Sequence, residues 1–131
     1  MEYKQLVSLA AEAKRNAYNP YSGYSVGAAL IAEDGTVFTG CNIENIAYPS
    51  GICAERVAFS KAISEGYRKF KAVAIVGSTE EMAYPCGMCR QFISEFVDPE
   101  FLVLCANMYG EYEQFKFSDL LPKIFNAKFK K

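Results

Sequence analysis

Two short motifs far apart in the chain constrain most strongly what it can fold into. They are Cys-x-Glu at residues 53–55 and Pro-Cys-x-x-Cys at residues 85–89. The 131-residue sequence contains no histidine, so a metal site built from these motifs must use thiolates. Any general acid or base must then be a carboxylate, lysine, tyrosine or cysteine. A fold that uses both motifs has to bring them together at one place.

Cys53, Cys86 and Cys89 supply three thiol ligands, and Glu55 supplies a carboxylate that is not needed as a ligand. Three thiolates on a tetrahedral zinc ion leave one position open, which distinguishes a catalytic zinc site from a closed structural one. The combination resembles the signature of zinc-dependent nucleobase deaminases. Glu55 is close enough in sequence to a ligand to act as a proton shuttle at the open position.

Other interpretations of the cysteines remain open at this point. Cys41 or Cys105 could complete a closed four-thiolate site, although both lie in apolar, strand-like segments where a cysteine behaves as a small hydrophobic residue. Cys86 and Cys89 alone could form a redox pair, but that interpretation leaves the Cys-x-Glu motif unexplained. The open catalytic site accounts for both motifs.

A zinc ion with three thiolates carries one net negative charge, which opposes deprotonation of a bound water. Arg56, beside Glu55, could offset this charge if its guanidinium reaches the sulfur atoms. A surface ion pair is the alternative role for this arginine. Both motifs are expected at helix N-termini, where free N–H groups and the helix dipole stabilise thiolates.

Length and charge limit the class of protein. The length favours one domain spanning residues 1–131. A net charge of −1 gives no electrostatic reason to bind nucleic acid or an anionic membrane. No apolar run approaches the roughly 20 residues that span a bilayer, and residues 1–15 lack the apolar stretch of a signal peptide, so we expect a cytoplasmic protein. The one basic cluster, Lys128, Lys130 and Lys131, is expected to be a solvated tail.

Hydrophobic periodicity predicts the element order α-β-β-α-β-α-β-β-α. The predicted helices are 3–17, 52–64, 86–96 and a short helix from 118, and the predicted strands are 26–33, 37–41, 70–76, 101–106 and 113–117. This order favours an α/β fold, a three-layer α/β/α sandwich around a mixed five-stranded sheet. The helices that carry the motifs are expected to follow neighbouring strands, so that their N-termini converge at the carboxyl end of the sheet.

Over essentially its full length, the chain resembles the small, homotetrameric, zinc-dependent cytidine deaminases. The matching blocks are 20–29, 40–45, 51–56, 85–91 and 120–122. The resemblance implies a cytidine deaminase-like fold and one Zn²⁺ per chain, held by Cys53, Cys86 and Cys89, with Glu55 as proton shuttle. It also implies an enzyme of pyrimidine salvage that hydrolyses cytidine and 2′-deoxycytidine to uridine and 2′-deoxyuridine and releases ammonia.

The resemblance further assigns substrate contacts within the chain. Asn42 and Glu44 match the pair that hydrogen-bonds the ribose, mainly its 3′-hydroxyl. Tyr24 stands where the family usually has a phenylalanine near the base and sugar, and the backbone around Ala54 and residues 84–85 would contact the base edge. Loop capping is the alternative role of Asn42 and Glu44.

The resemblance also implies active sites shared across subunits. Tyr48 and Phe125 match aromatic residues that a neighbouring subunit contributes. Ordinary core or surface packing is the alternative for Tyr24, Tyr48 and Phe125. Met88 and Tyr84 depart from the family, which mostly has a small residue and a serine there, so they leave the detailed substrate preference undetermined.

Three rival functions fit the sequence less well. A polynucleotide deaminase needs a cationic groove and stacking platforms along the strand, which a chain of this charge does not favour. A nucleotide deaminase needs cations for the 5′-phosphate, whereas Glu44 places an anion near the sugar. A zinc-stabilised binding module would leave Glu55 without a role.

Overall fold

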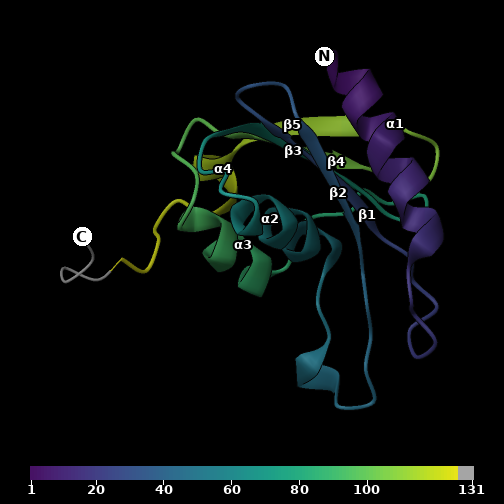
Figure 1. Ribbon diagram of the computed structural model, residues 1–131. Coiled ribbons are helices and arrows are strands. Elements are labelled where there is room, and N and C mark those ends of the chain that lie inside the picture. Colours follow the sequence, from purple (N-terminus) through teal and green to yellow (C-terminus); the bar gives the residue numbers. More distant parts are fainter. Residues whose placement is uncertain (127–131) are drawn as a thin grey trace.

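The computed structural model describes residues 1–126, and five strands of this part form one mixed sheet (Figure 1). The strands are β1 (Gly27–Ala32), β2 (Val37–Cys41), β3 (Phe70–Val76), β4 (Leu102–Ala106) and β5 (Tyr112–Lys116). Their order across the sheet is β2-β1-β3-β4-β5. Strands β3 and β4 are parallel, and the other neighbouring pairs are antiparallel. The predicted mixed five-stranded sheet is confirmed.

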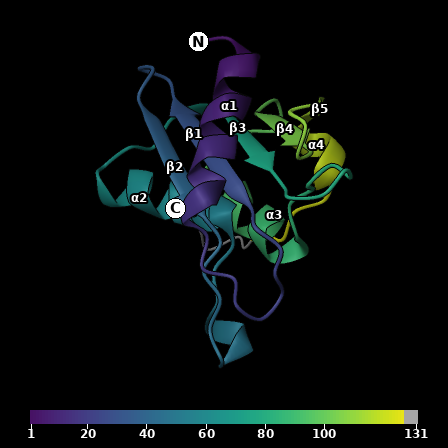
Figure 2. The ribbon, with the colours of Figure 1, turned by 90° about the vertical axis from the view of Figure 1, so that its right-hand side faces the viewer.

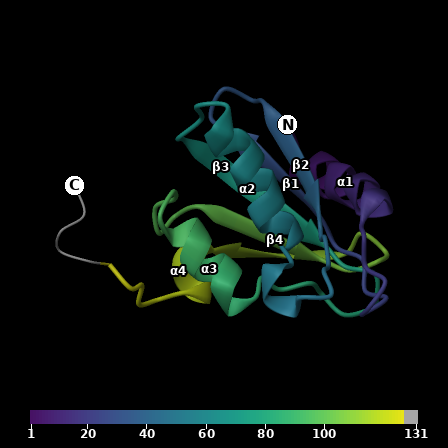
Figure 3. The same cartoon turned by 60° about the horizontal axis from the view of Figure 1, so that its bottom comes forward.

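Helices cover both faces of this sheet. The helical elements of the described residues are α1 (Tyr3–Ala13), α2 (Ala54–Ser64), α3 (Gly87–Ser94) and α4 (Phe117–Leu120), together with the 3₁₀ turns η1 (Lys14–Asn16) and η2 (Tyr48–Ser50). Helix α1 lies on one face (Figure 2), and α2 and α3 lie side by side on the other (Figure 3). The structure therefore confirms the predicted three-layer α/β/α sandwich.

The central strands are buried on both faces, as their continuous apolar sequences predict. Successive side chains point to opposite faces of a strand, so each strand contributes to two separate cores. The core beneath α2 and α3 contains Leu30, Val73, Ile75, Val103 and Cys105. The core beneath α1 contains Ala29, Ile31, Ala74, Val76 and Leu104.

The first turn of α2 lies directly against the backbone of β2. A Cβ atom added at Gly40 would lie 2.5 Å from the carbonyl oxygen of Ala54 and 2.7 Å from the nitrogen of Ala58. Gly27 allows a similar approach on the opposite face, since its Cβ would lie 1.9 Å from the carbonyl oxygen of Ala10. These two glycines let the helices pack closely and thereby position the start of α2.

Two sequence-based expectations need correction. Helices α2 and α3 follow β2 and β3, which are not neighbours, because β1 lies between them. Their N-termini still converge, because β1 is antiparallel to both flanking strands and β2 and β3 therefore end at the same edge. The predicted helix from residue 52 begins at Ala54, because Ile52 forms an antiparallel bridge with Ile43 and Cys53 has extended backbone angles.

Several helix ends also differ from the prediction. The predicted helix 3–17 ends at Ala13 and continues as the tighter η1 turn. Helix α3 is shorter than the predicted 86–96, since Cys86 is its extended N-cap residue. Within residues 1–126, none of the helices combines the length and the apolarity needed to cross a membrane. The predicted lysine cluster at Lys128, Lys130 and Lys131 lies outside the described residues.

Candidate metal centre and substrate cavity

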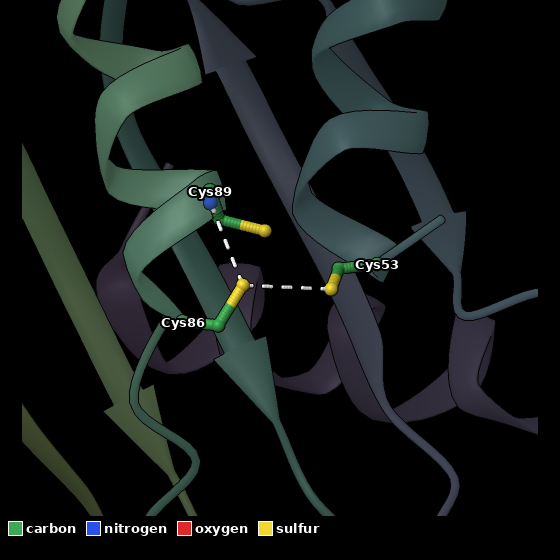
Figure 4. Close-up of side chains that lie close together, drawn as sticks. All are labelled: Cys53, Cys86 and Cys89. Atoms are coloured by element: carbon green, nitrogen blue, oxygen red, sulfur yellow. Dashed lines mark hydrogen bonds between the residues drawn. The ribbon is translucent and has the colours of Figure 1, made fainter. Parts of the chain in front are cut away.

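The sulfur atoms of Cys53, Cys86 and Cys89 lie within 4.8 Å of one another and point toward a common centre (Figure 4). The Sγ atoms of Cys53 and Cys86 are 3.7 Å apart. Tetrahedral zinc–thiolate bonds of about 2.3 Å place their sulfur atoms about 3.8 Å apart, so this separation fits a shared zinc ion. The donor set and its spacing are therefore those of a thiolate metal site.

Local backbone structure explains why the three thiols converge. Cys53 is the N-cap residue of α2 and Cys86 is the N-cap residue of α3. Cys89 lies in the first turn of α3, and its N–H group donates to the Cys86 sulfur at 3.5 Å. All three sulfur atoms thus lie at the positive ends of two helices, where negative charge is stabilised.

Neighbouring donors favour the thiolate form of Cys53. The hydrogen bond from Cys89, assisted by those from Arg56 and Cys86, outweighs burial and lowers the pKa of Cys53 to about 5. A guanidinium nitrogen of Arg56 lies 3.8 Å from the Cys53 sulfur. The Nε atom of Arg56 is buried without a hydrogen-bond partner among the described residues. Arg56 therefore contacts the cluster, as its predicted role in offsetting thiolate charge requires.

Glu55 is buried close behind the cluster, with only 3% of its surface exposed. Burial is the main cause that raises the pKa of this carboxyl to about 7, and the charge of Cys53 adds to it. Carboxylates are rarely buried unless they are paired or have a chemical role. The environment holds Glu55 near the point where it can both accept and release a proton at neutral pH.

A cavity of about 560 Å³ opens beside the cluster. Its walls include the three predicted site residues Asn42, Glu44 and Tyr48 together with Arg56 and two of the thiols. The complete lining consists of Tyr21, Ser22, Asn42, Ile43, Glu44, Asn45, Tyr48, Pro49, Gly51, Ile52, Cys53, Arg56, Cys86 and Met88. The structure thus brings the predicted ribose contacts and the thiol cluster to one cavity.

Other predicted site residues lie behind or beside this lining. Ala54 is fully buried at the start of α2. The Tyr24 hydroxyl lies directly beside Gly77, since a Cβ atom added at Gly77 would lie 2.2 Å from the hydroxyl oxygen. Burial, followed by the charge of Glu55, raises the pKa of Tyr24. Tyr24 and Ala54 therefore both lie near Glu55.

Asn42 serves the loop-capping role that the sequence left open. Its amide oxygen accepts from the Val26 N–H group at 2.9 Å, and its amide nitrogen donates to the Tyr24 carbonyl at 2.8 Å. Each end of an amide can form a second hydrogen bond. Asn42 can therefore hold this loop and still contact a ligand in the cavity.

Glu44 is fastened to the loop that precedes β1. Its Oε1 atom accepts from the N–H groups of Tyr21 and Ser22 at 2.9 and 3.1 Å, and its Oε2 atom accepts from the Ser22 hydroxyl. An ionised carboxylate offers about four acceptor positions. Three of them are used here, so a position on Oε2 stays available.

The two aromatic residues predicted to act across subunits are surface residues. Tyr48 is 72% exposed in η2, on a segment that extends away from the body of the molecule in Figures 1 and 2, and Phe125 is 80% exposed. Tyr48 packs edge-on against Tyr21, with ring centroids 5.7 Å apart. Core packing is therefore excluded for both Tyr48 and Phe125.

The structure also shows contacts that the sequence did not indicate. The Arg90 guanidinium donates to the carbonyl of Pro85 at 2.8 Å and to that of Leu120 at 2.6 Å. Gln91 donates to the carbonyl of Phe125 at 3.2 Å. These residues join the start of α3 to the segment that carries Phe125. Arg90 and Gln91 directly follow the second motif, and this position is the one feature of the sequence that could have pointed to them.

Neither remaining cysteine joins the metal cluster. Cys105 is fully buried in β4, where burial raises the pKa of its thiol to about 12, and Cys41 ends β2. Among the described residues, the group that could hold a metal ion contains Cys53, Cys86 and Cys89 alone. The geometry favours the open three-thiol site over a closed four-thiol one.

Comparison with known proteins agrees with this site. Residues 1–105 match the model of the cytidine and deoxycytidylate deaminase zinc-binding region. A cytidine deaminase of Sporosarcina psychrophila is 48% identical over 126 residues, which cover 96% of this chain and 93% of that protein. The chain belongs to the cytidine and deoxycytidylate deaminase family of enzymes.

Solved structures show the same fold. The crystal structure of cytidine deaminase from Burkholderia pseudomallei superposes with a TM-score of 0.92 at 44% identity, covering 95% of this chain and 100% of that one. The crystal structure of cytidine deaminase from Mycobacterium tuberculosis gives a TM-score of 0.85 at 34% identity, covering 97% and 99% of the two chains. The cytidine deaminase-like fold predicted from the sequence is confirmed.

Metal analysis of cysteine variants tests the cluster. We expect Cys41→Ser and Cys105→Ser to retain one zinc ion per chain, because neither thiol belongs to the three-sulfur group. Cys53→Ser and Cys89→Ser should lose most of it, since each removes one of three thiolates. The amount of zinc per folded chain, measured by elemental analysis, distinguishes the three-thiolate site from a four-thiolate site. Loss of zinc from Cys41→Ser or Cys105→Ser would indicate a fourth thiolate ligand.

Proposed function

We propose that this enzyme hydrolyses cytidine and 2′-deoxycytidine to uridine and 2′-deoxyuridine with release of ammonia, in pyrimidine salvage. The observation that carries the proposal is the buried carboxyl of Glu55 beside a cluster of three thiols at two helix N-termini. The membership of the family supports the same reaction. The expected cytoplasmic location and the single domain of residues 1–131 are part of this proposal.

Cys53, Cys86 and Cys89 would hold one Zn²⁺ per chain. The ion would lower the pKa of a bound water to about 7 and thereby provide a nucleophile at neutral pH. Arg56 contacts the Cys53 sulfur and would offset the negative charge of the three thiolates. Within the described residues this cluster contains no further residue that could serve as a ligand, which would leave a fourth position for water.

Glu55 would carry the protons of the reaction. It takes a proton from the attacking water and delivers it to N3 of the cytosine ring while the water oxygen bonds to C4. It then transfers the proton of the new C4 hydroxyl to the amino group, and the C4–N bond breaks to release ammonia and leave a carbonyl at C4. A carboxyl whose pKa lies near 7 suits both transfers.

The ribose would be bound on the opposite side of the cavity from the base. Glu44 and Asn42 line this cavity, and each retains at least one hydrogen-bonding position for a sugar hydroxyl. Tyr24 lies near Glu55, where it could pack beside the base, and the backbone at Ala54 would contact the base edge. Met88 also lines the cavity and would influence substrate preference.

Glu55→Gln tests the proton-transfer role. The amide keeps the shape of the side chain but cannot move protons, so we expect kcat to fall by about 100- to 10,000-fold. Zinc content and the circular dichroism spectrum should stay unchanged, because Glu55 is not a ligand. Ammonia release from cytidine measures the effect. Activity within a few fold of the unmodified enzyme would remove Glu55 from the mechanism.

We further propose a homotetramer whose active sites are shared between subunits. The exposure of Tyr48 and Phe125 supports this assembly, because aromatic side chains are enriched in the buried cores of subunit interfaces. Tyr48 lines the cavity and is itself largely exposed. A neighbouring subunit would complete this wall, and closed symmetric assembly is the usual arrangement of soluble oligomers.

Mixing variants tests the sharing of sites. We expect Phe125→Ala to raise KM for cytidine at unchanged zinc content, and the matched change at its exposed neighbour, Ile124→Ala, to have a smaller effect. Reassembly of Phe125→Ala with Glu55→Gln should restore sites that combine one intact residue from each variant. The activity of the mixture at cytidine concentrations below KM measures how many sites are restored. Sedimentation that shows a fully active monomer would contradict the proposal.

A further inference from the structure

Ser22 forms two of the three hydrogen bonds that hold the Glu44 carboxylate. Its N–H group donates to Oε1 at 3.1 Å, and its hydroxyl donates to Oε2. The third bond comes from the N–H group of Tyr21. One residue thus contacts both oxygens of the carboxylate, which fixes its rotation as well as its position.

The direction of the Ser22 hydroxyl is determined by a second contact. Its oxygen accepts from the N–H group of Tyr24 at 3.0 Å, so its own proton is free to point toward Glu44. An ionised carboxylate can only accept, which makes Ser22 the donor in this pair. Hydrogen bonds to a charged acceptor are stronger than those between neutral groups.

These bonds act on the chemistry of Glu44. The Ser22 hydroxyl is the main cause that lowers the pKa of Glu44, which shows that this contact favours the ionised carboxylate over the neutral acid. Both Ser22 and Glu44 line the cavity beside the thiol cluster. With three acceptor positions used, the remaining one on Oε2 has a direction set by Ser22.

We propose that Ser22 is a positioning residue that holds the Glu44 carboxylate in the orientation that accepts the 3′-hydroxyl of the substrate. Ser22 itself does not bind the substrate in this account. The inference rests on the proposed function, which assigns Glu44 to the sugar. Beyond that assignment, the inference states that the strength of the contact between Glu44 and the 3′-hydroxyl depends on Ser22, which belongs to a different loop.

The test compares 2′-deoxycytidine with 2′,3′-dideoxycytidine, which lacks the 3′-hydroxyl. We expect Ser22→Ala to lower kcat/KM for 2′-deoxycytidine about 5- to 10-fold, mainly through KM, since charge-assisted hydrogen bonds carry effects of this order. The same variant should change kcat/KM for the dideoxy substrate less than about twofold. Ser22→Thr, which keeps the hydroxyl, should recover most of the lost activity.

Ser25→Ala is the matched control, because it removes a hydroxyl from the same loop. The Ser25 hydroxyl accepts from Asn19, and within residues 1–126 no hydrogen bond joins it to Glu44. We expect Ser25→Ala to leave the ratio of the two substrates unchanged. An equal loss on both substrates in Ser22→Ala, or a loss that Ser22→Thr does not recover, would show a general structural role and overturn the proposal.

Glu44→Gln separates failure of this inference from failure of the proposed function. If Glu44→Gln reduces use of 2′-deoxycytidine selectively but Ser22→Ala does not, the inference is wrong and the sugar contact stands. If Glu44→Gln affects both substrates equally, the assignment of Glu44 to the sugar is wrong. In the double variant we expect little further loss beyond Glu44→Gln, because Ser22 acts through Glu44.

Discussion

The close approach of the α2 and α3 N-termini at one edge of the sheet is the contact on which the rest of the structure depends. It brings the Cys53 and Cys86 sulfur atoms to 3.7 Å from each other although the two residues come from different strand–helix units. Gly40 lets α2 pack against β2, and the shared direction of β2 and β3 places both helix starts at the same edge. Cavity, thiols and buried carboxyl all follow from this convergence.

At this edge of the sheet, the pKa values of Cys53 and Glu55 are shifted in opposite directions, although the two residues are close in sequence. Donors from Cys89 and Arg56 favour the charged form of Cys53, whereas burial favours the neutral form of Glu55. Groups whose environments shift them in opposite directions are suited to different roles. Here the thiol is suited to bind a cation, and the carboxyl is suited to carry a proton.

Much of the fold could be predicted from the sequence because its signals are local. The unbroken apolar runs of β3 and β4 indicated burial on both faces, and cysteine spacing indicated the three-thiol cluster. The position of β1 between β2 and β3 could not be predicted, since strand order depends on how crossovers pack. The Ser22–Glu44 contact joins two separate loops, and no spacing rule connects them.

The exposure of Tyr48 and Phe125 was also beyond local signals, because an aromatic residue suits a core and an interface equally. The η2 segment extends away from the body of the molecule, and for this reason Tyr48 lies on the surface and not in the core (Figure 1). Whether an aromatic residue such as Tyr48 or Phe125 belongs to the core or to the surface can be told only from the structure of the subunit. Their role in assembly stays a prediction.

The central claim is an open metal site with three thiolate ligands. X-ray absorption spectroscopy at the zinc edge of the purified enzyme tests it most directly, because sulfur and oxygen neighbours differ in distance and scattering. The account predicts three sulfur atoms at about 2.3 Å and one oxygen or nitrogen atom at about 2.0–2.2 Å. Four sulfur neighbours, or a protein purified without zinc that is fully active, would contradict it.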